Sequence, residues 1–192
     1  MNIVCIGDSL TFGYGVNSNE NWIHLVNSNL NLSLTNKGFN GDTTAGMLFR
    51  FYEDVTLNSP KYAFIMGGTN DFLLNYSVNN VIDNMESMLI EAKKNNIEVI
   101  LGIQPAVIPQ LANKYWMCSD YAKVNDRIQQ YKNWLLTYSM QNSLIYINFY
   151  DVIQKSLLTY KENELYLDGI HLTSKGHKIM AETFITSLSS LK

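Results

Sequence analysis

The chain has 192 residues, a length typical of one compact domain, and we expect residues 1–192 to form a single unit. Hydrophobic residues make up 46% and charged residues 16%, which is enough apolar material for a sizeable core and excludes a disordered chain. The 14 basic and 17 acidic residues give a net charge of −3. Because there is no basic excess to follow a phosphate backbone, we expect no nucleic acid partner.

The chain carries no recognisable signal for export or membrane insertion. Its N-terminal residues lack the basic region and the apolar length of a signal peptide, and no run of 18 apolar residues predicts a membrane span. Cys5 and Cys118 lie far apart, so they indicate neither a disulfide framework nor a zinc site. These features favour a cytoplasmic protein without stable membrane insertion, and we expect a monomer or a small homo-oligomer.

Short β-rich segments alternate with longer segments of helical periodicity. The expected strands cover residues 2–6, 32–36, 61–66, 98–103 and 144–149. All but the second contain apolar runs of the kind that a parallel sheet buries on both faces. The expected helices cover residues 20–29, 43–55 and 78–95, a segment that Ser119 can cap, and a segment after Thr173. Residues 102–118 form the one long irregular segment. Repeated strand–helix units with right-handed crossovers predict a three-layer α/β/α sandwich.

A serine follows the first expected strand, in Gly7-Asp8-Ser9-Leu10. Ligands of open α/β sheets bind beyond the carboxyl ends of the strands. A serine on a tight turn at that edge can present its Oγ to a substrate and its N–H to a developing oxyanion. The same residues also occur as an ordinary turn or helix cap, so the tetrapeptide alone does not decide between the two interpretations.

A nucleophilic serine needs a base, and the chain contains three histidines. We expect His24 on the side of a helix, and His177 in a surface or capping position of the last helix. His171 follows Asp168 by three residues, so one turn can hold both side chains. Asp168 could then accept the Nδ1–H of His171 and leave Nε2 to act as a base, as in serine triads. A purely structural contact between the two is the alternative.

Two further segments lie where other expected strands end. Asn70, in Gly67-Gly68-Thr69-Asn70-Asp71, can donate a hydrogen bond to negative charge on a substrate oxygen, although one asparagine among 23 is weak evidence. Gly41, in Gly38-Phe39-Asn40-Gly41-Asp42, precedes an expected helix, where free backbone N–H groups attract anions.

The four segments, in this order and spread over nearly the whole chain, resemble the SGNH or GDSL-type esterases and lipases. Residues 40–43 (Asn-Gly-Asp-Thr) are most similar to the bacterial thioesterase/lysophospholipase branch. The resemblance implies a flavodoxin-like fold with a five-stranded parallel sheet. It also implies that Ser9 is the nucleophile, His171 the base and Asp168 its partner. The oxyanion hole would consist of the backbone N–H groups of Ser9 and Gly41 and the side chain of Asn70.

We therefore expect a serine esterase or lipase that hydrolyses small to medium acyl esters, including thioesters or lysophospholipids, through an acyl-enzyme on Ser9. Its partner would be a small-molecule ester, and it would need no metal and no cofactor. Phe72 and Leu73, which follow Asn70, and Tyr115 and Trp116 could line the acyl pocket, or they could equally be core or loop residues.

Two alternatives remain open from the sequence. One is a carbohydrate O-deacetylase of the same family. The other is a nucleotide- or flavin-binding module, because the doubly wound architecture also serves those ligands. Gly13-Tyr14-Gly15 begins like a dinucleotide fingerprint but lacks the third glycine, and no P-loop motif is present.

Overall fold

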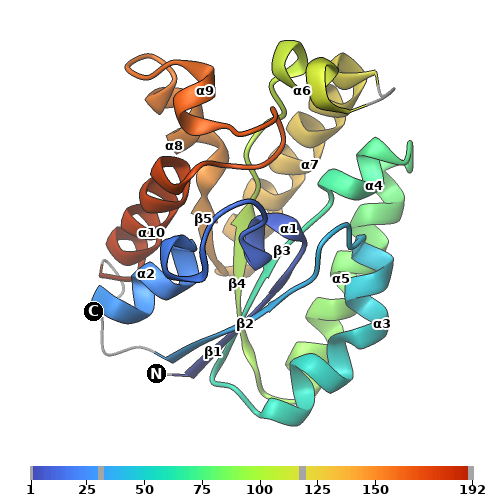
Figure 1. The fold of residues 1–192 in the computed structure, drawn as a ribbon. Coiled ribbons are helices and arrows are strands. Elements are labelled where there is room, and N and C mark those ends of the chain that lie inside the picture. The colour runs from blue at the N-terminus through green and yellow to red at the C-terminus, as the bar shows by residue number, and fades with distance from the viewer. Residues whose placement is uncertain (1, 30–32, 117–119, 190–192) are drawn as a thin grey trace.

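Five parallel strands form one sheet in the computed structural model, which describes residues 2–29, 33–116 and 120–189 (Figure 1). The strands are β1 (Asn2–Gly7), β2 (Ser33–Gly38), β3 (Tyr62–Met66), β4 (Glu98–Ile103) and β5 (Ile145–Asn148), and their order in the sheet is β2-β1-β3-β4-β5. This is the flavodoxin-like arrangement, so the predicted fold class is confirmed. Leu32, the first residue of the second expected strand, lies outside the described residues.

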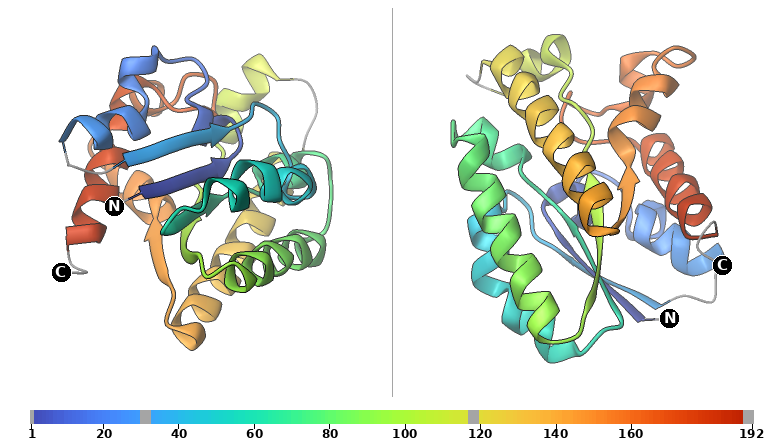
Figure 2. Two further views of the ribbon diagram at one scale, coloured as in Figure 1. Left: turned by 90° about the horizontal axis from the view of Figure 1, so that it is seen from below. Right: turned by 180° about the vertical axis from the view of Figure 1, so that it is seen from behind.

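Helices cover both faces of the sheet (Figure 2). The longer ones are α2 (Trp22–Asn29), α3 (Thr44–Asp54), α5 (Val78–Lys94), α7 (Tyr121–Asn142), α8 (Phe149–Ser156) and α10 (Ser174–Ser189). The shorter ones are α1 (Ser9–Phe12), α4 (Thr69–Leu73), α6 (Pro109–Tyr115) and α9 (Glu162–Leu165), with 3₁₀ turns η1 (Ser18–Glu20) and η2 (Thr56–Asn58). None of the helices in the described ranges is long and apolar enough to cross a membrane.

The core lies in two layers, one on each face of the sheet. Successive side chains of a strand point to opposite faces, so Val4 and Ile6 of β1 pack with α3, α5 and α7, while Ile3 and Cys5 pack with α2, α8 and α10. All four side chains are buried. This burial on both faces explains why residues 3–6 of β1 form a continuous apolar run rather than an alternating pattern.

The structure corrects three expectations about the chain path. The segment 102–118 is not irregular throughout, because α6 begins at Pro109, a residue well suited to the first turn of a helix. β5 ends at Asn148, whose side chain caps an additional helix, α8, by accepting the N–H of Asp151 at 3.0 Å. Asp120 caps α7; Ser119, the expected cap, lies outside the described residues.

The strand order places the ends of β1 and β3 at the switch point of the sheet. β1 pairs with β2 on one side and with β3 on the other, and all these pairs are parallel. Ser9 lies just after β1 and Asn70 just after β3, so these two residues meet at one edge of the sheet. In open α/β sheets, ligands bind at this position.

Candidate active site

Ser9, His171 and Asp168 form a continuous line of hydrogen-bonding contacts at this edge. Ser9 Oγ lies 3.0 Å from Nε2 of His171, and Nδ1 of His171 lies 2.7 Å from Oδ2 of Asp168. All three residues are buried. The spacing allows a proton to pass from the hydroxyl to the imidazole while the carboxylate holds the ring, which is the geometry of a serine triad.

The turn that carries Asp168 and His171 is organised by the carboxylate itself. Oδ1 of Asp168 accepts the backbone N–H groups of Ile170 at 2.9 Å and of His171 at 2.8 Å, and Oδ2 is left to face the imidazole. Burial raises the pKa of the Asp168 carboxyl, but the hydrogen bonds from His171 and Ile170 outweigh it, so the pKa lies below its ordinary value. The carboxylate is therefore held in the charged form that stabilises an imidazolium.

The residues after β4 support this turn from outside. The backbone N–H of Ile108 donates to the carbonyl oxygen of Gly169 at 2.7 Å. The hydroxyl of Tyr166 donates to the carbonyl oxygen of Ala106 at 2.8 Å. Residues 106–108 are thus docked on the loop that positions His171.

Two other candidate residues, Gly41 and Asn70, face the same hollow as Ser9. Gly41 has a φ of +76°, and no atom lies within 4 Å of a Cβ built there, so it is the conformation rather than the space that favours glycine. Nδ2 of Asn70 donates to the carbonyl oxygen of Asp42 at 2.8 Å. That bond uses one of the two amide hydrogens and leaves the other for a substrate oxygen.

Two buried carboxylates, each next in sequence to a residue that lines the hollow, hold the backbone there. Asp8 caps α1 by accepting the N–H of Leu10 at 2.9 Å, and burial raises its pKa to about 6 against the opposing effect of that bond. Asp71 accepts the N–H of Thr44 at 2.9 Å and its hydroxyl at 2.7 Å. Burial raises the pKa of Asp71 in spite of these bonds, which tie α4 to the start of α3.

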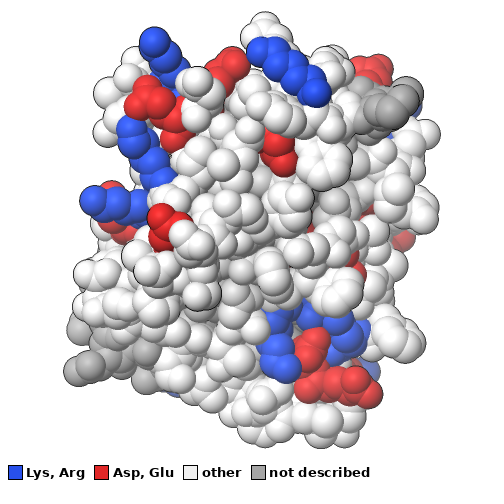
Figure 3. All heavy atoms as spheres, in the orientation of Figure 1, with Lys and Arg blue, Asp and Glu red and all other residues white. Residues whose placement is uncertain are grey.

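The hollow in front of Ser9 has a volume of about 320 Å³ and a largely apolar lining. Its lining residues are Ser9, Tyr14, Asn40, Gly41, Asn70, Leu73, Trp116, Ile170 and His171. The lining contains no Asp, Glu, Lys or Arg. The middle of the face in Figure 3, around the end of α1, is formed mainly by uncharged residues.

The structure separates the four residues expected to line an acyl pocket. Leu73 and Trp116 line the hollow. Phe72 does not: it is 1% exposed and packs in the core, with its ring 6.0 Å from that of Tyr131. The expectation for Phe72 is corrected for this reason. Tyr115 is 62% exposed and is not among the lining residues, so the expectation for it is also corrected.

Tyr14 is a site residue that sequence reasoning missed. Its ring lies against the ring of His171, with 4.3 Å between the centroids. The signal was its position five residues after Ser9, between Gly13 and Gly15. In the structure, Gly13 ends α1, and the next element, η1, has only three residues. The glycine pair therefore does not lead into a helix whose N-terminus could hold a pyrophosphate, so it gives no support to the nucleotide-binding alternative.

The other two histidines take no part in this arrangement. His24 is exposed on α2, as expected. His177 is not at the surface, contrary to expectation: it is 1% exposed, and its Nδ1 has no hydrogen-bond partner among the described residues. Burial lowers the pKa of His177 to about 4, the charge of His171 acts in the same direction, and Glu20 opposes both. His177 is therefore a neutral core residue of α10.

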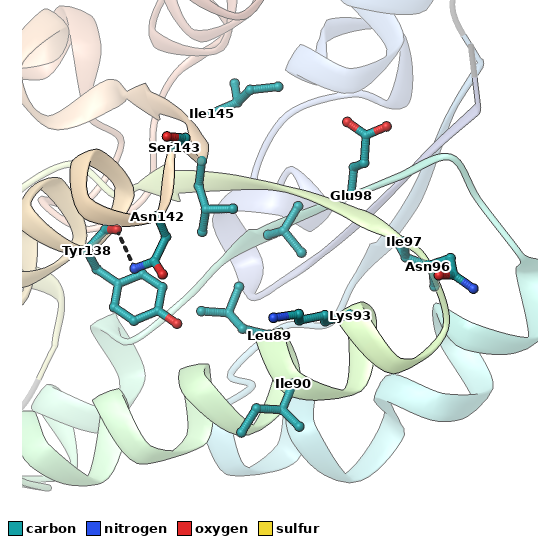
Figure 4. A pocket seen from close by; sticks show the side chains of 12 residues that line it. Leu89, Ile90, Lys93, Asn96, Ile97, Glu98, Tyr138, Asn142, Ser143 and Ile145 are labelled. Carbon is teal, nitrogen blue, oxygen red and sulfur yellow. Dashed lines mark hydrogen bonds between the residues drawn. The ribbon is translucent and has the colours of Figure 1, made fainter.

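A second hollow, of about 620 Å³, lies at the opposite end of the strands (Figure 4). It is bordered by α5, α7 and the first residues of β4 and β5, and it contains Leu89, Lys93, Tyr138 and Ile145. None of the candidate catalytic residues lines it. Ser9 and His171 instead line the smaller hollow described above.

Comparison with known proteins identifies the family of the chain. Residues 5–179 match the model of the GDSL-like lipase/acylhydrolase family. The chain belongs to this family. Esterase TesA of Pseudomonas aeruginosa is 28% identical over 108 residues, which is 53% of this chain and 54% of TesA. The chain spans about half the length of the curated relatives it matches.

Solved structures share the fold over almost the whole chain. A lipolytic protein of the G-D-S-L family from Desulfitobacterium hafniense has a TM-score of 0.83 and 22% identity, with 97% of this chain and 98% of that chain covered. A catalytic mutant of Axe2, an acetylxylan esterase from Geobacillus stearothermophilus, has a TM-score of 0.80 and 20% identity, with 97% and 93% covered. At these identities, the similarity establishes the fold of this family member.

Proposed function

We propose that this GDSL-family protein hydrolyses carboxylic esters through an acyl-enzyme on Ser9. The observation that carries the proposal is the pair of contacts from Ser9 Oγ to His171 Nε2, at 3.0 Å, and from His171 Nδ1 to Asp168 Oδ2, at 2.7 Å. A serine hydroxyl is a weak nucleophile unless an adjacent base removes its proton, and here the base and the group that orients it are both within hydrogen-bond reach.

The proposed reaction has two acyl-transfer steps. In the first, His171 Nε2 takes the proton of Ser9 Oγ as the oxygen attacks the ester carbonyl carbon. The tetrahedral oxyanion accepts hydrogen bonds from the N–H groups of Ser9 and Gly41 and from Nδ2 of Asn70. Collapse of this intermediate releases the alcohol, which takes the proton from His171. In the second step, water attacks the acyl-enzyme, His171 takes its proton, and the acid leaves as that proton returns to Ser9 Oγ.

The lining of the hollow supports esters of small to medium acyl chains that are uncharged near the scissile bond. Leu73, Trp116 and Ile170 supply apolar surface in a volume of about 320 Å³. A thioester or a lysophospholipid fits this proposal where its acyl end occupies the hollow and its charged end stays outside. Location in the cytoplasm and assembly as a monomer or small homo-oligomer remain predictions from the sequence.

A carbohydrate O-deacetylase is the second candidate, and one observation favours it. The rings of Tyr14 and Trp116 lie 4.3 Å and 5.8 Å from the ring of His171, measured between centroids. Two aromatic faces beside the catalytic base provide a surface on which a sugar leaving group could pack.

Hydrolysis of p-nitrophenyl acetate, butyrate and octanoate and of an acetylated xylose tests both candidates. We expect turnover by the wild type and by Ser28→Ala, a control at an exposed serine of α2, and none by Ser9→Ala. Mass spectrometry of rapidly quenched reactions should show an acyl adduct on Ser9. Equal turnover by Ser9→Ala and the wild type would refute the proposed nucleophile. A much higher kcat/KM for the acetylated sugar than for all three simple esters would favour the deacetylase.

A further inference from the structure

Arg50 of α3 does not line the hollow but donates hydrogen bonds to the segments that surround it. Its Nε donates to Oδ2 of Asp42 at 2.8 Å, and its Nη2 donates to the carbonyl oxygen of Gly7 at 3.0 Å. Its Nη1 donates to the carbonyl oxygen of Lys37 at 2.8 Å and to Oδ2 of Asp54 at 2.6 Å. Four of the five guanidinium N–H groups are thus paired, and the side chain is only 18% exposed.

Two of these bonds join the ends of neighbouring strands. Gly7 is the last residue of β1 and stands two residues before Ser9. Lys37 is near the end of β2, from which the chain continues to Gly41. The guanidinium of Arg50 therefore connects the strand that leads to the candidate nucleophile with the strand that leads to a candidate oxyanion donor.

Asp42 continues this connection to the second candidate donor. Its carboxylate accepts a hydrogen bond from Nε of Arg50, and its backbone carbonyl oxygen accepts one from Nδ2 of Asn70 at 2.8 Å. The carboxylate lies directly against α3, because a Cβ at Gly46 would stand 2.0 Å from Oδ1 of Asp42. Side chain and backbone of Asp42 thus link Arg50 to the amide of Asn70.

We propose that Arg50 is a positioning residue that holds the oxyanion hole in register with Ser9. The inference rests on the proposed ester hydrolysis. The guanidinium is planar and rigid, so its four bonds fix the strand ends and Asp42 relative to one another. Donors must stand about 2.7–3.1 Å from the oxyanion to stabilise it, and a misplacement of about 1 Å can cost about 100-fold in rate.

A role limited to helix stability explains only one of the four bonds. The pair between Arg50 and Asp54 spans one turn of α3, and such a pair alone stabilises a helix. The bonds to Gly7, Lys37 and Asp42 leave the helix and reach three other positions of the chain. The positioning role accounts for all three.

The first test compares Arg50→Met with Lys37→Met. We expect Arg50→Met to lower kcat roughly 10- to 100-fold while KM changes less than about threefold, because the substrate's ground state does not need the oxyanion donors. Arg50→Lys keeps the charge beside Asp42 but not the planar fork, so its kcat should be intermediate. Lys37→Met is the matched control: it removes the ammonium that pairs with Asp54 at 2.9 Å and leaves the carbonyl oxygen that Arg50 contacts. It should retain the kcat of the wild type.

The second test is a double-mutant cycle with Asn70→Ala. If Arg50 acts through Asn70, then Arg50→Met should cost several-fold less in kcat when Asn70 is already alanine than when it is present. An equal cost in both backgrounds would overturn the inference. Circular dichroism and thermal unfolding check that each variant folds, and Arg50→Lys takes the place of Arg50→Met in the cycle if the latter does not. A wild type that hydrolyses no ester would instead overturn the proposed function, and this inference with it.

Discussion

The ring of Tyr14 packs on the ring of His171 at a tilt of 39°. In the proposed reaction His171 becomes an imidazolium each time it takes a proton. The face of an aromatic ring attracts a cation at this distance, with a free energy of about 0.5–2 kcal/mol. Tyr14 therefore belongs to the electrostatic surroundings of the base as well as to the wall of the hollow.

Replacing Tyr14 by leucine should lower kcat about 2- to 30-fold, the equivalent of that cation–π contact. Tyr14→Phe keeps the ring and should retain a kcat close to that of the wild type. Steady-state kinetics with p-nitrophenyl butyrate measures both variants. The same kcat for Tyr14→Leu and Tyr14→Phe would contradict a contribution of the ring to the base.

Replacing Asn70 by alanine should lower kcat by roughly 10²–10³-fold, the effect typical of losing one donor of an oxyanion hole. The reason is that one hydrogen of Asn70 Nδ2 donates to the carbonyl oxygen of Asp42, and in the proposed reaction the other donates to the substrate oxygen. Asn79→Ala, at an exposed position of α5, is the control and should be neutral. An unchanged kcat for Asn70→Ala would remove Asn70 from the site.

Replacing Asp168 by asparagine should leave the turn intact and lower kcat by roughly 10⁴-fold. The two backbone N–H groups of Ile170 and His171 need an acceptor, so the amide oxygen must take the place of Oδ1. The NH₂ group then donates to Nδ1 of His171, so the ring carries its proton on Nε2. A protonated Nε2 cannot accept the proton of Ser9. Thermal unfolding should show a folded protein, and activity near the wild-type level at neutral pH would contradict the assignment.

Replacing His177 by leucine should make the free energy of unfolding fall less at acidic pH than it does in the wild type. The folded-state pKa of His177 is about 4 and the value for an unperturbed side chain is 6.5, so protonation favours the unfolded chain. The free energy of unfolding is therefore unaffected by His177 above pH 6.5. It falls as the pH drops from 6.5 towards 4, by about 3 kcal/mol in total. Urea unfolding at pH 7.5 and 4.5 measures it, and His24→Gln, at an exposed histidine, is the control. An equal pH dependence for His177→Leu and the wild type would refute the prediction.

The parts of the fold and site that depend on local sequence could be predicted. Apolar runs such as the one within residues 61–66 identify strands that are buried on both faces, since few other environments accept so many apolar residues in succession. The spacing of Asp168 and His171 limits both to one turn. The strand ends then bring Ser9 and Asn70 together, because parallel strands end at the same edge.

Other features depend on packing between distant segments and were missed. The bonds of Arg50 join three parts of the chain, and no spacing in the sequence marks them. The burial of His177 did have a signal: it lies at helical intervals from Met180, Ala181 and Phe184, which are all buried. Phe72 was misassigned because residues after β3 form a helix, α4, that turns this side chain into the core.

The docking of residues 106–108 on the turn that holds Asp168 and His171 has a consequence for engineering. The crossover after β4 has two separate duties: Ile108 supports the turn of His171 through Gly169, while Trp116, eight residues later, borders the hollow. Libraries that vary residues 113–116 can therefore change the wall of the hollow, including the Trp116 ring 5.8 Å from that of His171, while the support of the turn through Gly169 stays in place. Insertions between β4 and Ile108 would instead shift the support of His171, so the hollow is easier to redesign towards the end of α6 than at its beginning.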